Sequence, residues 1–506
     1  MRSKSILSLV WLTSLVVVLF SCNLSGSGDG VGDMLISNTQ FLGRGYDVFS
    51  AYADPLDVRG EVLDFDEMNN AGHIEQLQLE RADFDTIEGQ DVETYMNKLS
   101  QKVEVSASYA GFSGSVKVNF DEGHYTNSSY SFATVTSLIQ KYSARIKAGI
   151  PVATLKTFLT DNADAMLNDG DVEPLTVFLA FGTHVMRGII IGGRLDYSVS
   201  ADMTEVGGDK SIGVFAEVGY EGAFDVNVTS ETVSAAEWSD FTSSSKKTLK
   251  VYGGASEYGQ YIINEDEQSY VPWIESIGDN PVFCEFDSSN PLIPIWEFCD
   301  NPDRSQELQD YFNSTYAANN AILTSDAPHL CILEIGLYDF QSKYEVYYAN
   351  HNPINPIYGR YAIVQNLNED AGGDYIYIWY KYGYDNDPDL EPIDGIYIVN
   401  TTDGDSWAQP GYLKPEVLPS NFNWPGLDLN REAGGDHIYL FYTRGGSDPI
   451  RSISTTNTDG KRYYSLPTTI VTVNPGVSYV QDATHNLNAG SNGDGIYLWT
   501  STDLVD

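Results

Sequence analysis

The most regular pattern of apolar and polar residues along the chain has a period of two and covers residues 211–229. Its odd positions hold mostly glycine, glutamate, aspartate and asparagine, and Phe215 is the one bulky exception. This pattern predicts a β-strand whose two faces meet different surroundings. The segment exceeds the ~9–11 residues that a barrel strand needs to cross hydrocarbon, so it fits a membrane-crossing strand. It also fits a half-buried strand in a soluble sheet. The even face holds Ile212, Val214, Ala216, Val218, Tyr220, Gly222, Phe224, Val226 and Val228.

A second, less regular alternation covers residues 103–120. Apolar residues occupy odd positions at its start and even positions at its end, where Val116 and Val118 lie. The change of parity falls near Ala110 and Gly111, and a β-bulge accounts for such a shift. This segment is therefore a second candidate for a membrane-inserting strand, with a half-buried soluble strand as the alternative.

Between these segments, the stretch FGTHVMRGIIIGG at residues 181–193 joins a predicted helix to a predicted strand. An apolar helix is expected to begin after Pro174 and to end at Gly182, and a β-branched, alternating strand follows it. The Gly192-Gly193 pair lies inside that strand, where glycine permits a sharp bend or a close backbone approach. No carboxylate or cysteine nearby suggests a catalytic partner for His184, so we expect it to be a buried, hydrogen-bonded residue beside the turn.

The chain from about residue 328 onward is strand-like and contains three copies of one motif. The copies NLNEDAGGDYIYIWY (366–380), DLNREAGGDHIYLFY (428–442) and NLNAGSNGDGIYLWT (486–500) align without gaps. In each, a glycine-containing turn leads into a half-buried strand. Three all-β copies predict pseudo-threefold closure, with three small sheets around one core. The repeated turn residues are Asn368, Gly373 and Asp374, then Asn430, Gly435 and Asp436, then Asn488, Gly493 and Asp494.

The start of the chain is typical of an exported lipoprotein. Arg2 and Lys4 precede an apolar run that ends in LFSC at residues 19–22, which resembles a bacterial lipobox. Residues 1–22 are therefore expected to be a signal peptide, and Cys22 is expected to be acylated. Residues 23–33 are rich in glycine and serine and read as a flexible tether. The alternatives are an uncleaved anchor and an ordinary signal peptide.

Charge and cysteine content narrow the possible partners. With 71 acidic and 28 basic residues the formal net charge is -43, so the chain should repel nucleic acid and bare anionic lipid. A membrane would have to be reached through a receptor, a glycan or bound cations. In an oxidising compartment Cys284 and Cys299 are a plausible disulfide that leaves Cys331 over, although three cysteines allow three pairings.

Candidate chemistry is sparse. No nucleophile–base pair, metal-ligand cluster or phosphate-binding loop is evident, so an enzyme has no support in the sequence. Asp385, Asp387 and Asp389 alternate in YDNDPDLE and could hold Ca²⁺, but a full ligand loop is missing and a solvated acidic turn explains them as well. No other cofactor is indicated.

The stretch around Gly182 resembles the signature of the membrane-attack-complex/perforin family. That signature has an aromatic residue, Gly-Thr-His, another aromatic residue, a six-residue spacer and Gly-Gly. Phe181, Gly182, Thr183, His184, Gly192 and Gly193 match it, whereas Val185 replaces the second aromatic residue. LGRGYDV (42–48), YGGASEYG (252–259) and WIESI (273–277) follow the family's order, and Gly253 and Gly254 are hinge candidates. The resemblance covers residues 34–325, and residues 328–506 resemble the β-prism domain found attached to perforin-like proteins.

The resemblance implies an α+β fold in which clusters of short helices flank a sharply bent, four-stranded antiparallel sheet, followed by an all-β prism of three repeats. In pore-forming members the clusters unravel into hairpins, here around 103–127 and 203–246. The expected protein is a pore-forming toxin that forms a ring on a target membrane. Its prism would bind a glycan, a lipid headgroup or an outer-membrane protein, and the alternative for this domain is a purely structural cap. It would be secreted or held at the bacterial outer membrane or cell surface. The alternative is a non-lytic adhesion or glycan-binding protein with the same fold.

Overall fold

The computed structural model describes most of the chain after residue 39, so Cys22 and the expected signal peptide and tether lie outside the described residues. Nothing in the fold therefore bears on those expectations. The described residues are 40–105, 111–170, 172–206, 209–226, 228–229, 231–264, 267–287, 291–321, 323, 327–340, 354–355, 360–363, 365–368, 371–401, 412–418, 428–431, 433–456, 462–463, 480–481, 486–489 and 495–503.

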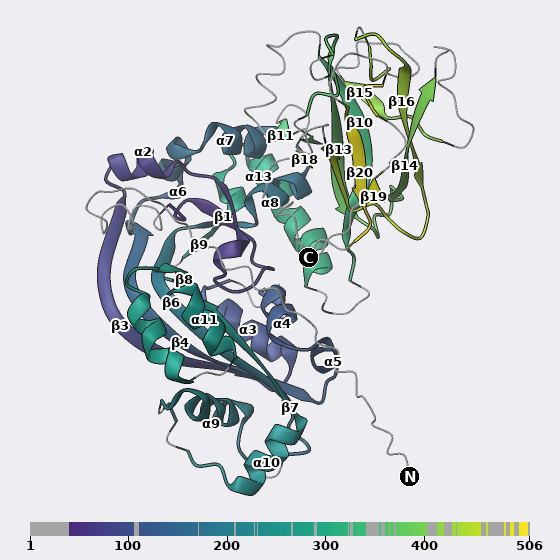
Figure 1. The fold of residues 1–506 in the computed structure, drawn as a ribbon. Coiled ribbons are helices and arrows are strands. Elements are labelled where there is room, and N and C mark those ends of the chain that lie inside the picture. The colour runs from purple at the N-terminus through teal and green to yellow at the C-terminus, as the bar shows by residue number, and fades with distance from the viewer. Residues whose placement is uncertain are drawn as a thin grey trace, which may run out of the picture.

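A large antiparallel sheet forms the centre of the N-terminal region (Figure 1). Its four main strands are adjacent in the order β3, β4, β6 and β7, and they form the antiparallel sheet that the family resemblance implied. A short fifth strand, β8, pairs with the first part of β6, an addition that the sequence did not indicate. The strands are β3 (Ile74–Gly89), β4 (Tyr130–Ile146), β6 (Gly188–Asp202), β7 (Ser245–Tyr252) and β8 (Val282–Phe286).

The sheet is irregular along one line that crosses its strands. The register of β3 against β4 shifts between Gln78 and Arg81, and that of β4 against β6 shifts between Gln140 and Tyr142. Gln140 faces Gly192, so these shifts lie beside the Gly-Gly pair of β6. Bulges bend a strand and increase its twist, and here they lie together where Figure 1 shows β3 and β4 curving.

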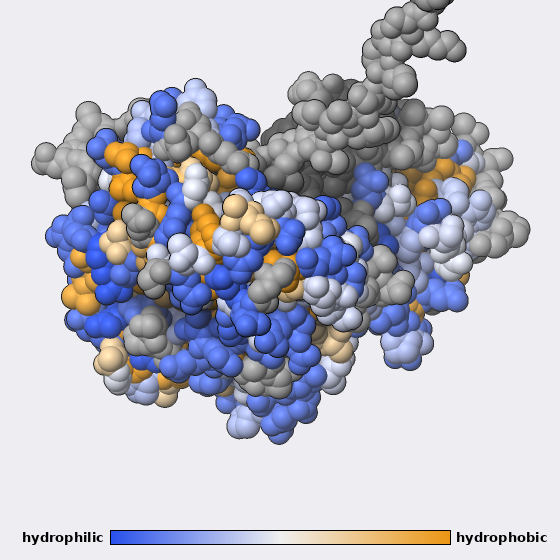
Figure 2. All heavy atoms as spheres, turned by 90° about the horizontal axis from the view of Figure 1, so that it is seen from below, coloured by the Kyte–Doolittle hydropathy of each residue, from blue (hydrophilic) through white to orange (hydrophobic). Residues whose placement is uncertain are grey.

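Two groups of helices are inserted between the strands of this sheet. The first, between β3 and β4, contains α3 (Val92–Lys102), α4 (Ser113–Asn119) and α5 (Glu122–Tyr125). The second, between β6 and β7, contains α9 (Ile212–Phe224) and α10 (Ala235–Ser244). We call them the first and second helical clusters. Figure 2 views the molecule from below, the side on which α9 and α10 lie in Figure 1, and hydrophilic residues cover most of that face.

The expectation that residues 211–229 form a strand is wrong for this structure, because residues 212–224 are helical. The same holds in part for residues 103–120, because residues 113–119 are helical and residues 106–110 lie outside the described part. The physical reason is that apolar residues in α9 also recur every three or four positions. Residues at that spacing lie on one face of a helix, which can be buried as a whole. That buried face consists of Ile212, Phe215, Ala216, Gly219, Tyr220 and Phe224.

A smaller four-stranded sheet and several helices pack beside the large one. Its strands β1 (Arg44–Tyr46), β2 (Val58–Glu61), β5 (His184–Met186) and β9 (Leu292–Pro294) lie in the order β2, β1, β5, β9. The predicted helix after Pro174 is present as α8 (Pro174–Phe181), and Gly182 is its C-cap. The remaining α-helices are α2 (Phe65–Asn70), α6 (Val152–Leu155), α7 (Asp161–Asn168), α11 (Ser256–Ile263), α12 (Tyr270–Ser276), α13 (Pro302–Tyr311) and α14 (Ala317–Asn320). Short turns of other helix types are η1 (Pro55–Asp57), η3 (Lys156–Phe158), η4 (Glu267–Ser269), η5 (Ile295–Phe298) and η6 (Phe312–Tyr316).

The described part of the C-terminal region forms three separate sheets. The first contains β11 (Ile354–Asn355), β12 (Arg360–Ala362), β13 (Tyr375–Tyr384), β10 (Leu330–Phe340) and β15 (Glu416–Leu418). The second pairs β14 (Ile393–Thr401) with β16 (His437–Arg444). The third contains β18 (Arg462–Tyr463), β17 (Ser452–Thr456), β20 (Tyr497–Ser501) and β19 (Val480–Gln481). Backbone hydrogen bonds from Ile332 to Ile450 (2.8 Å) and from Ile450 to Ile393 (2.7 Å) join the sheets.

The repeated motif produces the same hydrogen bonds in each copy. The backbone N–H groups of Leu367, Leu429 and Leu487 each donate to the carbonyl of an isoleucine near the start of the following strand (Ile376, Ile438 and Ile496), over 2.8, 2.8 and 2.7 Å. In the first two copies the asparagine amide holds the turn, because Asn368 donates to the carbonyl of Asp374 and Asn430 to that of Asp436. Gly373 and Gly435 have positive φ angles of 84° and 97°, which favour glycine. Asn488 is buried, and Gly493 and Asp494 lie outside the described residues.

The proposed Cys284–Cys299 disulfide is wrong, because both thiols are free and buried. The Cys284 thiol lies 3.5 Å from the carbonyl oxygen of Ile190, and the Cys299 thiol lies 3.4 Å from that of Leu167. Each cysteine is thus held by a different part of the fold. Burial raises the pKa of Cys299 to about 11, which keeps its thiol protonated at neutral pH.

None of the described helices is both long enough and apolar enough to span a bilayer.

Candidate functional site

The Gly-Thr-His turn fastens the first strand of the chain to the end of α8. Gly182 has a φ of 70°, and a Cβ atom there would lie 2.5 Å from the carbonyl carbon of Tyr46. Thr183 donates its backbone N–H to the Tyr46 carbonyl over 3.1 Å and accepts the N–H of Val48 at its hydroxyl, also over 3.1 Å. Only glycine followed by a small hydroxyl residue fits this approach, so the motif serves backbone packing. Phe181 is buried directly before it.

His184 is a buried, hydrogen-bonded residue, as the sequence indicated. Its Nδ1 lies 3.0 Å from the hydroxyl of Thr183, and its ring packs edge-on against Trp296 and Phe312. Burial lowers the pKa of His184 to about 3, so the imidazole carries no charge at neutral pH. With these neighbours its role is to support the turn.

The Gly192-Gly193 pair marks the point at which β6 changes partners. Before the pair, β6 lies beside β8, where Gly192 faces Val282; after it, β6 lies beside β7, where Arg194 faces Tyr252. A Cβ atom at Gly192 would lie 1.9 Å from the backbone oxygen of Ile139, a contact that no side-chain movement relieves. Glycine at this position therefore permits close contact with β4.

The second glycine pair meets the first in space. Gly253 and Gly254 both have a φ of 73°, and a Cβ atom at Gly253 would lie 2.6 Å from the carbonyl oxygen of Gly192. The indole of Trp273 donates to the Gly253 carbonyl over 2.9 Å and blocks the space beside Gly254. The bend candidate and the hinge candidate of the sequence therefore lie together in the fold, beside the buried Trp273.

Arg194, directly after the Gly-Gly pair, is a central residue that the sequence analysis missed. It is buried, and it donates to the backbone carbonyls of Tyr52 (3.0 Å), Ala53 (3.1 Å) and Cys284 (2.9 Å). Its Nε lies 3.0 Å from a carboxylate oxygen of Asp196. Burial opposes the charge, but Asp196 and other neighbours outweigh it and raise the pKa of Arg194. The available signal was an arginine directly after the apolar run and glycine pair of this strand, with Asp196 two residues further on, since buried charges are paired.

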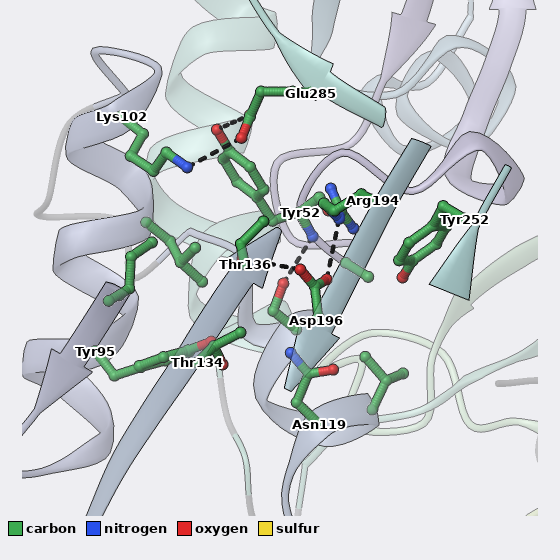
Figure 3. Close-up of a pocket in the computed structure, with 15 residues that line it drawn as sticks. Tyr52, Tyr95, Lys102, Asn119, Thr134, Thr136, Arg194, Asp196, Tyr252 and Glu285 are labelled. Atoms are coloured by element: carbon green, nitrogen blue, oxygen red, sulfur yellow. Dashed lines mark hydrogen bonds and ion pairs between the residues drawn. The ribbon is translucent and has the colours of Figure 1, made fainter. Parts of the chain in front are cut away.

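A small polar cavity lies beside Arg194, between the sheet and the first helical cluster (Figure 3). Its volume of about 30 Å³ has room for one or two water molecules and for no organic substrate. The labelled side chains in Figure 3 come from α3 and α4, from β4, β6, β7 and β8, and from the segment around Tyr52. The cavity therefore lies in a polar part of the contact between the sheet and the first helical cluster.

The candidate membrane-inserting residues divide between buried and exposed positions. Ile212, Tyr220, Phe224 and Val116 are buried, whereas Val214, Val218, Val226 and Val228 are half-buried and Val118 is 44% exposed. This fold thus buries only some of the apolar residues that belong to the period-of-two pattern.

The acidic turn at Asp385, Asp387 and Asp389 makes internal contacts. Asp385 lies 3.2 Å from a guanidinium nitrogen of Arg451, and a carboxylate oxygen of Asp387 accepts the backbone N–H of Asp389 over 2.9 Å. No group of three or more metal-ligating side chains occurs within the described ranges. Asp385 and Asp387 thus hold this turn through contacts within the protein.

The chain is similar to known proteins in both sequence and structure. Residues 27–315 match the model of the MAC/Perforin domain. The crystal structure of GNIP1Aa from Chromobacterium piscinae is similar over 80% of this chain and 82% of its own, with 19% identity and a TM-score of 0.50. A putative cell invasion protein with a MAC/Perforin domain from Bacteroides thetaiotaomicron is similar over 61% of this chain and 65% of its own, with 14% identity and a TM-score of 0.42. No curated protein matches the sequence.

Proposed function

The chain belongs to the MAC/Perforin domain family, and from this premise we propose that it is a pore-forming protein. In the proposed mechanism, copies associate on a target membrane, and the two helical clusters leave the sheet as β-hairpins that cross the bilayer. The proposal requires segments that are stable as helices in one state and as membrane strands in the other.

The observation that carries the proposal is the double periodicity of α9. In the resting helix Phe215 is buried and stacks on Phe241 with ring centroids 4.7 Å apart, although Phe215 breaks the period-of-two pattern. Val214 and Val218 fit that pattern, yet the helix leaves them only half-buried. A soluble helix has no need of valine there, because valine is a modest helix former. A strand with one face in lipid does need it.

The first cluster shows the same mismatch at one position. Val118 is 44% exposed on α4, whereas Val116 on the same helix is fully buried. Both residues have even numbers, so an extended strand would place them on one face. The exposed valine is consistent with a second conformation in which it is covered by lipid.

The outer strands of the large sheet support self-association. β3 and β7 are at opposite edges, and an unpaired edge is a template for another strand. Their charges are complementary, which favours edge-to-edge contact between copies. β3 carries Glu75, Glu80, Asp83, Asp85 and Glu88, and β7 carries Lys246, Lys247 and Lys250.

We propose that the C-terminal region is a three-sided β-prism that binds the target through a glycan, a lipid headgroup or an outer-membrane protein. The three sheets and the repeated turn hydrogen bonds support this architecture. We further propose that Cys22 is acylated and holds the protein at a bacterial surface before release. Loss of palmitate labelling in a Cys22→Ser variant would be the direct check.

The test of pore formation compares Val218→Asp with Ala223→Asp. Both residues are half-buried on α9, but only Val218 lies on the apolar face of the predicted strand. A charge facing lipid at mid-membrane costs about 2–4 kcal/mol for Lys or Arg, and less for Asp, in every subunit. Val218→Asp should therefore abolish dye release from target vesicles or cells, whereas Ala223→Asp should retain most of it.

Two further measurements make that test decisive. The two variants should have similar melting temperatures and bind target cells equally, since neither change touches the C-terminal region. If Val218→Asp releases dye as well as the parent, this segment does not enter the bilayer. If the parent itself never permeabilises a membrane that it binds, the non-lytic adhesion function replaces the proposal.

A further inference from the structure

One lysine joins the first helical cluster to two strands of the large sheet. Lys102 is the last residue of α3, and its Nζ lies 3.0 Å from Glu285 Oε2 on β8 and 3.1 Å from Asp85 Oδ2 on β3. Figure 3 shows the lysine reaching across the edge of the polar cavity towards Glu285. A single amine thus ties the end of α3 to strands that are not neighbours in the sheet.

Glu285 is held from several sides. The hydroxyl of Tyr52 and the backbone N–H of Phe286 both donate to Glu285 Oε1. The Glu285 side chain is only 8% exposed and that of Lys102 is 27% exposed, so the pair is largely removed from water. Burial opposes the charge on Lys102, but Glu285, Tyr52 and Asp85 outweigh it and raise the pKa of Lys102 well above its usual value.

Such a pair is a poor choice if stability alone is required. Desolvation offsets much of the attraction between buried charges, and well-packed apolar residues would hold the helix at least as firmly. What an ion pair adds is dependence on geometry, because the attraction falls steeply once water enters between the charges. A contact of this kind holds firmly while closed and contributes little once opened.

We propose that the Lys102–Glu285 pair is a latch that keeps the first helical cluster on the sheet until membrane insertion, and that this cluster is released independently of the second. This inference rests on the proposed function. Asp85 makes the latch accessible from solvent, because it binds Lys102 while its side chain is 54% exposed on the outer strand β3. A cationic group that docks on that edge competes with Lys102 for Asp85 and weakens the latch.

Hydrogen–deuterium exchange of the full chain in solution, without any membrane, tests the latch. In Lys102→Met, exchange across 92–102 and 113–119 should accelerate by at least about tenfold, since an unpaired buried charge destabilises its surroundings. Exchange across 212–224 should not change. Lys98→Met is the matched control, because Lys98 lies exposed on the same helix and its replacement should leave both regions unchanged.

Glu285→Gln keeps the shape of the pair and removes one charge, so it decides the question if Lys102→Met does not fold. It should accelerate exchange in the same two regions only. Unchanged exchange there, or equal acceleration across 212–224, overturns the latch. The readout involves no lysis, so a failed latch leaves the Val218→Asp test standing. Conversely, a chain that never permeabilises membranes can still show the latch.

Discussion

The two helical clusters cover the same sheet, and both pack aromatic side chains against its strands. In the first, Phe120 contacts Phe132 of β4 with ring centroids 4.9 Å apart; in the second, Tyr220 contacts Phe84 of β3 with centroids 5.8 Å apart. Among the described residues, only the first cluster also forms salt bridges to the sheet, such as that between Lys102 and Glu285. Within the second, Phe215 of α9 stacks on Phe241 of α10 with centroids 4.7 Å apart.

Under the proposed function, this difference would place the release of the two clusters under separate control. Apolar packing is not directional and weakens gradually as surfaces separate, whereas an ion pair depends on the position of a few atoms. We therefore expect the first cluster to respond to single charge changes and the second to respond to lost apolar volume. The predictions below test that separation, beginning with the largest expected effect.

Phe215→Ala should loosen the second cluster and leave the first in place. Truncating a buried phenylalanine typically removes about 3–5 kcal/mol of stability through lost burial and the cavity that remains. Exchange across 212–224 and 235–244 should accelerate strongly, while 92–102 keeps its protection. Val214→Ala, a half-buried neighbour on the same helix, is the control and should have a much smaller effect. Equal loosening of both clusters would mean that they are one cooperative unit.

The dependence of stability on acid pH tests His184, which lies on β5 and belongs to neither helical cluster. The folded-state pKa of His184 is about 3, below its unfolded value of 6.5, so the folded protein binds fewer protons between those pH values. Its contribution to stability is therefore complete above pH 6.5 and falls by up to about 1.4 kcal/mol per pH unit as the pH decreases.

Denaturant titrations at several pH values measure that slope. His184→Gln should flatten the fall in unfolding free energy below pH 6.5, and His73→Gln, at a half-buried position, serves as the control. A parent and a His184→Gln variant with the same slope would contradict a neutral His184 in the folded state.

Ser234→Ala should produce the smallest change and confine it to α10. Ser234 and Glu237 form a capping box, in which each side chain binds the other residue's backbone N–H. Loss of an N-cap of this kind costs about 1 kcal/mol. We expect faster exchange at the first turn of α10 and no change in α9 or α3. Ser239→Ala, exposed in the middle of the same helix, is the comparison, and an effect of equal size there would exclude a capping role.

Local sequence determined several elements of the fold. Pro174 and Gly182 set the ends of α8, because proline suits a first helical turn and glycine accepts the positive φ at its end. The β-branched run around Ile190 produced a long strand, and the glycine pair within it marked an irregular position in the sheet. The three motif copies each lead into a strand through the same leucine-to-isoleucine backbone hydrogen bond, and the first two copies have matching turns.

Other features depended on contacts between distant residues. Residues 212–224 contain both a period of two and a helical face, and the helix forms because the surrounding fold offers Phe241 and Tyr270 as partners. The predicted Cys284–Cys299 disulfide was wrong because the number of residues between two cysteines does not determine where the fold places them. Each thiol lies against the backbone carbonyl of a different segment. The tertiary structure likewise decided three placements. Trp273 lies beside the two glycine pairs, Arg194 lies behind the bend, and Glu285 lies opposite Lys102. The physical reason is that a buried charge or a close backbone approach is acceptable only when its partner, remote in sequence, is in place.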